Sequence, residues 1–164
     1  MNKILVGLSG LLLVINFSLA QKPNFSGTWA MDRARSFGLP PDVQQTIIVT
    51  QTNNTIELET KITNAKGESS IRDNYTIDGV EREFTPQGPT GPIPDSKGKR
   101  KANWLPNGRG IVVEEETTTQ TAKGPTTGRL TRKWTISNDG ELTIDLYIDD
   151  QRGSFETKRT FIKK

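Results

Sequence analysis

Four charged residues lie where the alternating pattern of apolar side chains predicts a buried face. Two are acidic and two are basic: Asp73, Glu115, Arg132 and Arg159. A lone buried charge is costly, so such residues pair with one another, face a cavity or meet water at a strand end. On its face Arg132 lies between Leu130 and Trp134, and Arg159 lies between Phe155 and Phe161, which predicts that the stems of both arginines lie well inside. For Asp73 and Glu115 a position at the solvated rim is the simpler interpretation.

The sequence excludes most kinds of catalytic chemistry. It contains no Cys and no His, which removes thiol nucleophiles, His-based triads and the usual zinc and copper sites. The triplet Glu114-Glu115-Glu116 offers carboxylates, but in a strand Glu114 and Glu116 share the solvated face. Glu115 with Asp73 opposite would suit acid–base work, yet nothing in the sequence places the two together. We therefore expect a protein that is not an enzyme, with no catalytic residue, metal or cofactor.

The elements that must position these residues are β-strands. After residue 20 no helical period is sustained, whereas alternation of period two, rich in Thr and β-branched residues, recurs nearly to the end. Short turns punctuate the alternation and leave no room for the crossover helices of a parallel sheet. About ten strands are predicted: 25–32, 44–52, 55–63, 69–78, 81–86, 101–105, 111–120, 128–137, 141–150 and 154–162.

One wet face and one dry face on nearly every strand favour a sheet that closes on itself. The prediction is one all-β domain at 21–164, a single antiparallel up-and-down β-barrel of about eight to ten strands. A two-sheet sandwich is the alternative. Two segments break the rhythm: residues 33–42 have room for one helical turn, and the Pro- and Gly-rich residues 86–99 are interpreted as a mobile loop.

Residues 1–20 have the pattern of a cleaved signal peptide. Lys3 precedes an apolar stretch, and Ser18 and Ala20 occupy the small-residue positions before a cut after Ala20. A retained membrane anchor is the alternative. We therefore expect a periplasmic or secreted protein with no membrane span after cleavage.

The charge balance argues against a nucleic-acid partner. Loss of Lys3 leaves 21 basic and 19 acidic residues, a mild and evenly spread excess. The densest basic run, at 97–101, is interpreted as a solvated loop edge, with an anionic surface as the alternative partner. We expect a monomer.

Two segments near the ends of the chain carry a resemblance to known proteins. The stretch "SGTW" provides Gly27 and Trp29 at the start of the first strand, and "ETKRTFIKK" provides Arg159 on the last. This pattern resembles the calycin group, which comprises lipocalins, fatty-acid-binding proteins and avidin-like barrels. It is most similar to the lipocalin-like domains of exported bacterial proteins. The resemblance implies a structural plug, in which Trp29 closes one end of the barrel and Arg159 lies across its indole. The helices of lipocalins and fatty-acid-binding proteins have no counterpart in the sequence.

The predicted interior mixes aliphatic residues with polar and aromatic ones, which is the usual make-up of a small-molecule site. We expect a small hydrophobic or amphiphilic ligand in the barrel, with Arg132 meeting an anionic head group. The predicted ligand contacts are Tyr75, Trp104, Arg132, Trp134 and Glu115. In the alternative, these aromatic residues are ordinary core and the loops act as a protein-interaction or inhibitor module at the cell envelope.

Overall fold

The computed structural model describes residues 22–164; the predicted signal peptide and its cleavage site lie outside this range. The described chain consists of strands and turns, and it contains no apolar helix long enough to cross a membrane. The strands are β1 (Gly27–Phe37), β2 (Gln44–Gln51), β3 (Thr55–Asn64), β4 (Gly67–Thr76), β5 (Arg82–Phe84), β6 (Gln87–Gly88), β7 (Gly91–Pro92), β8 (Ser96–Trp104), β9 (Gly110–Thr121), β10 (Gly124–Ile136), β11 (Leu142–Asp150) and β12 (Gly153–Lys163).

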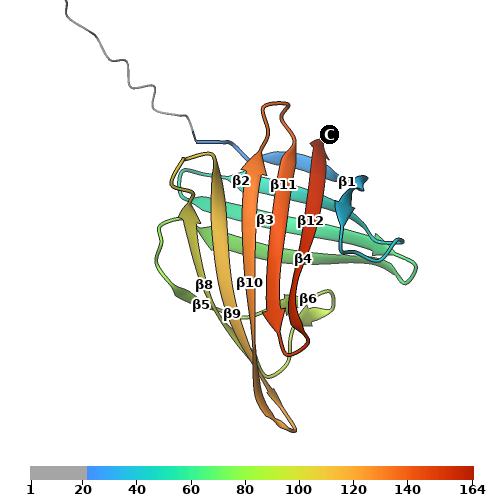
Figure 1. Ribbon diagram of the computed structural model, residues 1–164, viewed down its shortest axis with the longest axis vertical. Helices are drawn as coiled ribbons and strands as arrows, with labels where there is room; N and C mark the ends of the chain where they lie inside the picture. Colours follow the sequence, from blue (N-terminus) through green and yellow to red (C-terminus); the bar gives the residue numbers. More distant parts are fainter. Residues whose placement is uncertain (1–21) are drawn as a thin grey trace, which may run out of the picture.

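One antiparallel sheet of ten strands follows the course of the chain. Its order is β4-β3-β2-β1-β12-β11-β10-β9-β8-β5, so the first long strand pairs with the last. In Figure 1, β8–β12 run along the long axis of the molecule and β1–β4 cross them. The predicted all-β, up-and-down barrel-like fold is therefore confirmed.

The sheet is not closed, because β4 and β5 form its two edges. We call the gap between β4 and the β5–β8 pair the seam. Near one end of β4, an isolated parallel bridge joins Ile77 to Ala102 across this gap. The seam is the feature that separates this fold from a continuous barrel, in which no strand has a free edge.

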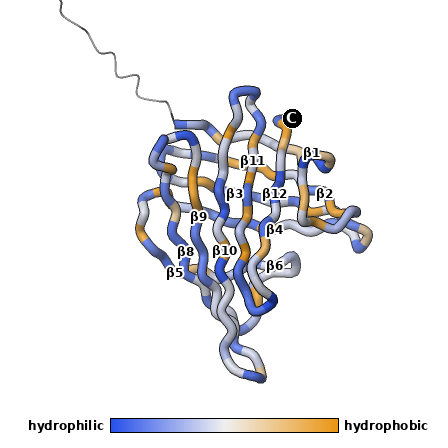
Figure 2. The backbone as a smooth tube through the Cα atoms, viewed as in Figure 1, coloured by the Kyte–Doolittle hydropathy of each residue, from blue (hydrophilic) through white to orange (hydrophobic). Residues whose placement is uncertain are grey.

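The core lies between the two crossing groups of strands. Hydrophobic and hydrophilic residues alternate along β11 in Figure 2, which matches the period of two that predicted the strands. The buried apolar residues come from both groups and from the segment before β1: Phe25, Trp29, Met31, Ile47, Val49, Ile56, Leu58, Tyr75, Ile77, Ala102, Ile111, Val113, Trp134, Leu142, Ile144, Leu146 and Phe161.

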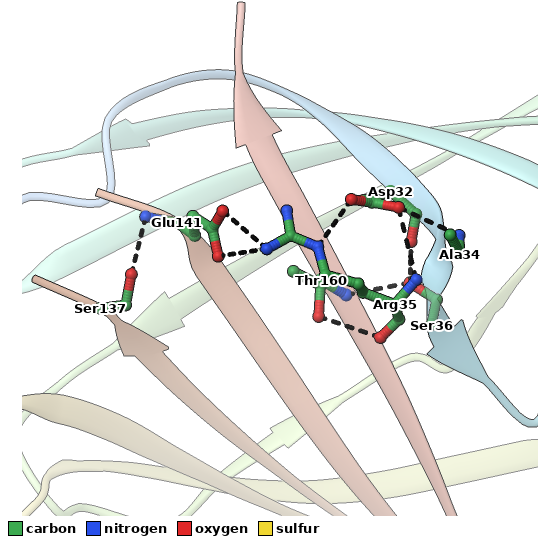
Figure 3. Close-up of polar contacts among 7 residues, drawn as sticks. All are labelled: Asp32, Ala34, Arg35, Ser36, Ser137, Glu141 and Thr160. Atoms are coloured by element: carbon green, nitrogen blue, oxygen red, sulfur yellow. Dashed lines mark hydrogen bonds and ion pairs between the residues drawn. The ribbon is translucent and has the colours of Figure 1, made fainter. Parts of the chain in front are cut away.

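Residues 33–42 do not form the predicted helical turn. Instead β1 continues to Phe37, with a shift in its pairing to β12 between Asp32 and Phe37. The Asp32 carboxylate accepts hydrogen bonds from the backbone N–H groups of Ala34 and Arg35 at the position of this shift. The Arg35 guanidinium then joins Asp32 to Glu141, with N···O distances of 2.7 Å to each carboxylate (Figure 3). A side-chain network, which no periodicity reveals, therefore keeps the strand extended.

The segment 86–99 is shorter as a loop than predicted. Residues 96–99 belong to β8, and the two-residue strands β6 and β7 form a small hairpin within the remainder. Alternation within β8 explains the difference. Lys97 and Lys99 are exposed on the outer face, whereas Gly98, Arg100 and Ala102 are buried. The basic run is thus part of a strand with one buried charge.

Candidate functional site

The inner face of the barrel carries a group of polar side chains next to the aromatic core. We call this group the inner polar cluster. Its members come from β4, β8, β9, β10 and β12: Asp73, Tyr75, Arg100, Glu115, Arg132, Thr157 and Arg159. All four charges predicted on the dry face belong to it. The strands bring them together because each residue is at an inward-facing position of its own strand.

Glu115 lies at the centre of the cluster, between two arginines. Arg100 is directly opposite Glu115 in the β8–β9 register, and its Nε donates to Oε1 of Glu115 at 2.5 Å. Nη1 of Arg132 donates to Oε2 of the same carboxylate. The Glu115 side chain is only 5% exposed, so it is a buried residue and not the rim residue that the sequence favoured. Two charge-assisted bonds offset the cost of burying it.

Arg100 also crosses the seam. Its Nη2 donates to the Asp73 carboxylate at 2.7 Å and its Nη1 to the backbone carbonyl of Asn74 at 2.9 Å, both on β4. The guanidinium carbon lies 4.0 Å from the ring centre of Phe84 and 4.8 Å from that of Tyr75, within the range of cation–π attraction. Arg100 therefore holds β4 against β8 where the backbone ladder is missing.

Sequence reasoning missed Arg100. Five basic and small residues in succession, "KGKRK", indicated a solvated loop edge. The signal that would have found it is the alternation of Gly98, Arg100 and Ala102, which continues the apolar face of the predicted strand at 101–105 backwards by three residues. Gly98 is small for a reason: a Cβ there would lie 2.3 Å from the Phe84 ring that covers Arg100.

Arg159 is the uncompensated charge of the cluster. Its Nε is buried and finds no acceptor among residues 22–164. Burial, together with the charge of nearby Arg132, lowers the pKa of the Arg159 guanidinium to about 10. For Arg132, burial also opposes the charge, but its neighbours Tyr75, Glu115 and Asp73 outweigh burial and raise its pKa above the ordinary value. The cluster thus has three arginines against two carboxylates, a net excess of one positive charge.

Three further polar atoms in this region are buried without a partner in the described part of the chain: Tyr75 Oη, Trp134 Nε1 and Thr157 Oγ1. Tyr75 and Trp134 are in ring contact, with centroids 6.1 Å apart. Thr157 is two residues from Arg159 and pairs with Leu146, which also pairs with Arg132. Burial raises the pKa of the Tyr75 hydroxyl, so this group stays a neutral donor. Unpaired buried donors next to an unpaired cation are unfavourable unless a ligand or water meets them.

The aromatic residues that the sequence predicted as ligand contacts lie mainly in the core. Trp134 and Tyr75 are almost completely buried, and Phe25 packs edge-on against Trp134 with centroids 5.8 Å apart. Trp104 is partly buried and stacks on Phe25 at 6.5 Å, towards the end of the barrel where Lys22 lies 4.7 Å from its ring centre. These rings pack against one another in the core, and Tyr75 belongs both to this aromatic group and to the inner polar cluster.

The cation that lies over the Trp29 ring is Lys163 and not Arg159, the residue that the resemblance implied. Trp29 is buried, its indole N–H donates to the Phe25 carbonyl at 2.9 Å, and the Lys163 ammonium lies 5.3 Å from its ring centre. The register explains this, because Trp29 pairs with Lys163 whereas Arg159 is opposite Ile144. Gly27 has a φ of +139°, a backbone conformation that favours glycine; the nearest atom to a Cβ there, Lys163 Cε at 2.7 Å, belongs to the end of a flexible side chain.

On its other side the cluster borders an apolar belt. Leu130, Ile148 and Phe155 are adjacent across β10, β11 and β12, and Phe155 remains 40% exposed. A separate hollow of about 320 Å³ is lined by residues of β9, β10 and the β11–β12 turn, including Thr117, Thr126, Asp150 and Arg152. The inner face therefore has an apolar belt next to the arginines of the cluster.

Residues 22–164 contain no group of three or more carboxylates that could hold a metal ion. The arrangement is suited to binding, because fixed donors and a surplus positive charge lie next to apolar side chains. The chain matches no model of a known protein family, and no curated protein shows significant similarity to it.

Proposed function

We propose that this protein is an exported, lipocalin-like binder of a small amphiphilic molecule with an anionic head group. The observation that carries the proposal is Arg159: its side chain is partly buried, its Nε is buried without an acceptor in residues 22–164, and it lies near Arg132. A head group bonded to Arg159 would compensate its charge. It would also accept hydrogen bonds from the free hydroxyls of Tyr75 and Thr157.

The apolar belt supports an amphiphile over a fully polar anion. Leu130 and Ile148 are partly buried and Phe155 is exposed, so a hydrocarbon chain extending from the cluster along these three residues would cover apolar surface that water now meets. Such burial is worth about 25 cal/mol per Å². Two anchoring arginines and one apolar path define the class of ligand, an acyl or aryl acid, without specifying its length.

One observation favours the alternative function, a solid barrel whose loops bind another protein. The rings of Phe25, Tyr75 and Trp134 pack against one another in the interior, which leaves less room for a ligand there. The segment between β5 and β8 also presents Ile93 with 41% of its surface exposed, as loop-mediated recognition requires.

Isothermal titration calorimetry with dodecanoate, and with 1-dodecanol as the neutral control, separates the two functions. We expect saturable binding of one dodecanoate and weaker binding of the alcohol. Arg159→Met should weaken dodecanoate by about 10- to 100-fold, since a hydrogen bond to a charged group is worth about 1.5–3 kcal/mol. The same substitution should not lower stability, because it removes an uncompensated buried charge.

Arg129→Met is the matched control. Arg129 lies on the same strand as Arg132 but is 70% exposed on the outer face, where it pairs with Glu116. This variant should bind dodecanoate as the unmodified protein does. The absence of saturable binding by a folded protein would favour the loop-mediated alternative. Equal affinity for acid and alcohol, or full binding by Arg159→Met, would exclude the anionic head-group site.

A further inference from the structure

The strand β4 has an open backbone edge of defined length. Because Arg100 reaches the Asn74 carbonyl from across the seam, Asn74 turns its backbone groups towards the gap. Residues two apart in a strand share this direction, so Glu68, Ser70 and Arg72 do the same. Within residues 22–164 no strand pairs with this side of β4. The open edge therefore spans residues 68–72, and Arg100 limits it at one end.

This edge lacks three of the features by which proteins protect a free strand, namely proline, lysine and a β-bulge. The sequence "ESSIR" at 68–72 contains no Pro and no Lys, and β4 pairs with β3 in an unbroken register without a bulge. The opposite edge strand, β5, is only three residues long and Pro86 follows it closely. Short strands and prolines block edge-to-edge pairing, so β4 is the unprotected edge of the sheet.

The side chains on this edge are complementary to themselves. Glu68, Ser70 and Arg72 all point to the outer face and are exposed, Arg72 with 81% of its side chain. If a second β4 lies antiparallel about a twofold axis at Ser70, Glu68 of each copy is opposite Arg72 of the other. Residues 68, 70 and 72 then all occupy hydrogen-bonded positions, since each turns its N–H and C=O towards the partner strand.

We propose that β4 is a dimerisation edge, at which a second copy of this chain adds its own β4 antiparallel across a twofold axis at Ser70. The pairing is isologous and closed, so it yields a dimer and not a fibre. A groove of about 580 Å³ beside this edge is lined by Arg72 and Asn74 together with Phe84 and Gln87, so the segment after β5 lies near the Arg72 end of the edge without pairing to it. The sequence alone predicted a monomer. Alternation along a strand does not reveal whether that strand lies at a free edge or inside a closed barrel.

The test is the molar mass of the purified protein, measured by sedimentation velocity over a concentration series. We expect a reversible dimer. Glu68→Arg and Arg72→Glu should each weaken the dimer by at least about tenfold, because every dimer then has two like-charge pairs. The double variant, Glu68→Arg with Arg72→Glu, restores both ion pairs in reversed orientation and should dimerise like the unmodified protein. Arg129→Glu alters a charge on the outer face of β10, outside the proposed edge, and should leave the dimer unchanged.

Circular dichroism and thermal melting establish that each variant is folded, and the double variant separates loss of assembly from loss of folding. A folded protein that stays monomeric throughout the concentration series would overturn the proposal. So would a dimer that tolerates both single charge reversals, or one that the double variant fails to restore, because either result would locate the interface elsewhere.

Discussion

Replacing Arg100 by Met removes the side chain that joins β4 to β8 across the seam. The change leaves the Asp73 carboxylate, 15% exposed, without its ion-pair partner, and Glu115, 5% exposed, with Arg132 alone. It also frees the Asn74 carbonyl. Breaking a buried ion pair by removing one partner costs about 3–5 kcal/mol, which is a large part of the 5–15 kcal/mol that stabilises a typical domain.

Urea unfolding followed by tryptophan fluorescence measures this cost. With an m-value of about 2 kcal/mol/M, a loss of about 4 kcal/mol lowers the midpoint by about 2 M. Because much of the loss comes from the unpaired Asp73, the double variant with Asp73→Asn should be more stable than Arg100→Met alone. Arg129→Met, which breaks the exposed pair with Glu116, should cost about 0–1 kcal/mol. If Arg100→Met cost no more than this control, Arg100 would not be what holds the seam.

Two further predictions concern single buried or constrained positions. Burial raises the pKa of Tyr75 above its ordinary value of 10.0, so folded Tyr75 keeps a proton that the unfolded chain releases. Its contribution to stability is complete below pH 10 and falls as the pH rises further. Urea midpoints should show this decline, and Tyr75→Phe should reduce it more than Tyr147→Phe, because Tyr75 is buried and Tyr147 is exposed. Gly27 has φ of +139°, so Gly27→Ala should lower stability by about 1–3 kcal/mol in thermal or urea unfolding, whereas a neutral result would mean that the backbone relaxes there.

Periodicity was sufficient for most of the long strands and for the inward direction of four charges. Alternation assigns Asp73, Glu115, Arg132 and Arg159 to the apolar face, and the structure has all of them facing inwards. What periodicity lacks is pairing between strands. The opposition of Arg100 to Glu115 depends on where β8 begins, and the basic run concealed that boundary.

The cation over Trp29 and the shift in the pairing of β1 with β12 show the same limit. Which cation lies over Trp29 depends on the register between the first and last strands, which are more than a hundred residues apart in the sequence. The extension of β1 beyond Asp32 depends on hydrogen bonds from Arg35 and Ala34 to one carboxylate. Both are specific side-chain arrangements, and hydrophobic patterning predicts faces and not partners.

The geometry around Glu115 links the seam to the proposed ligand site. Glu115 uses Oε1 for Arg100 and Oε2 for Arg132, and the hydrogen bond from Arg132 engages its Nη1. A head group attracted by Arg159 therefore meets the remaining donors of Arg132 without displacing Glu115, and the contacts of Arg100 across the seam persist. The surplus of the inner polar cluster is a single positive charge, so a monoanion neutralises it. A dianion would instead leave a net negative charge in a buried region, which is costly. The same balance of charges that joins β4 to β8 across the seam thus also favours a carboxylate over a more highly charged ligand.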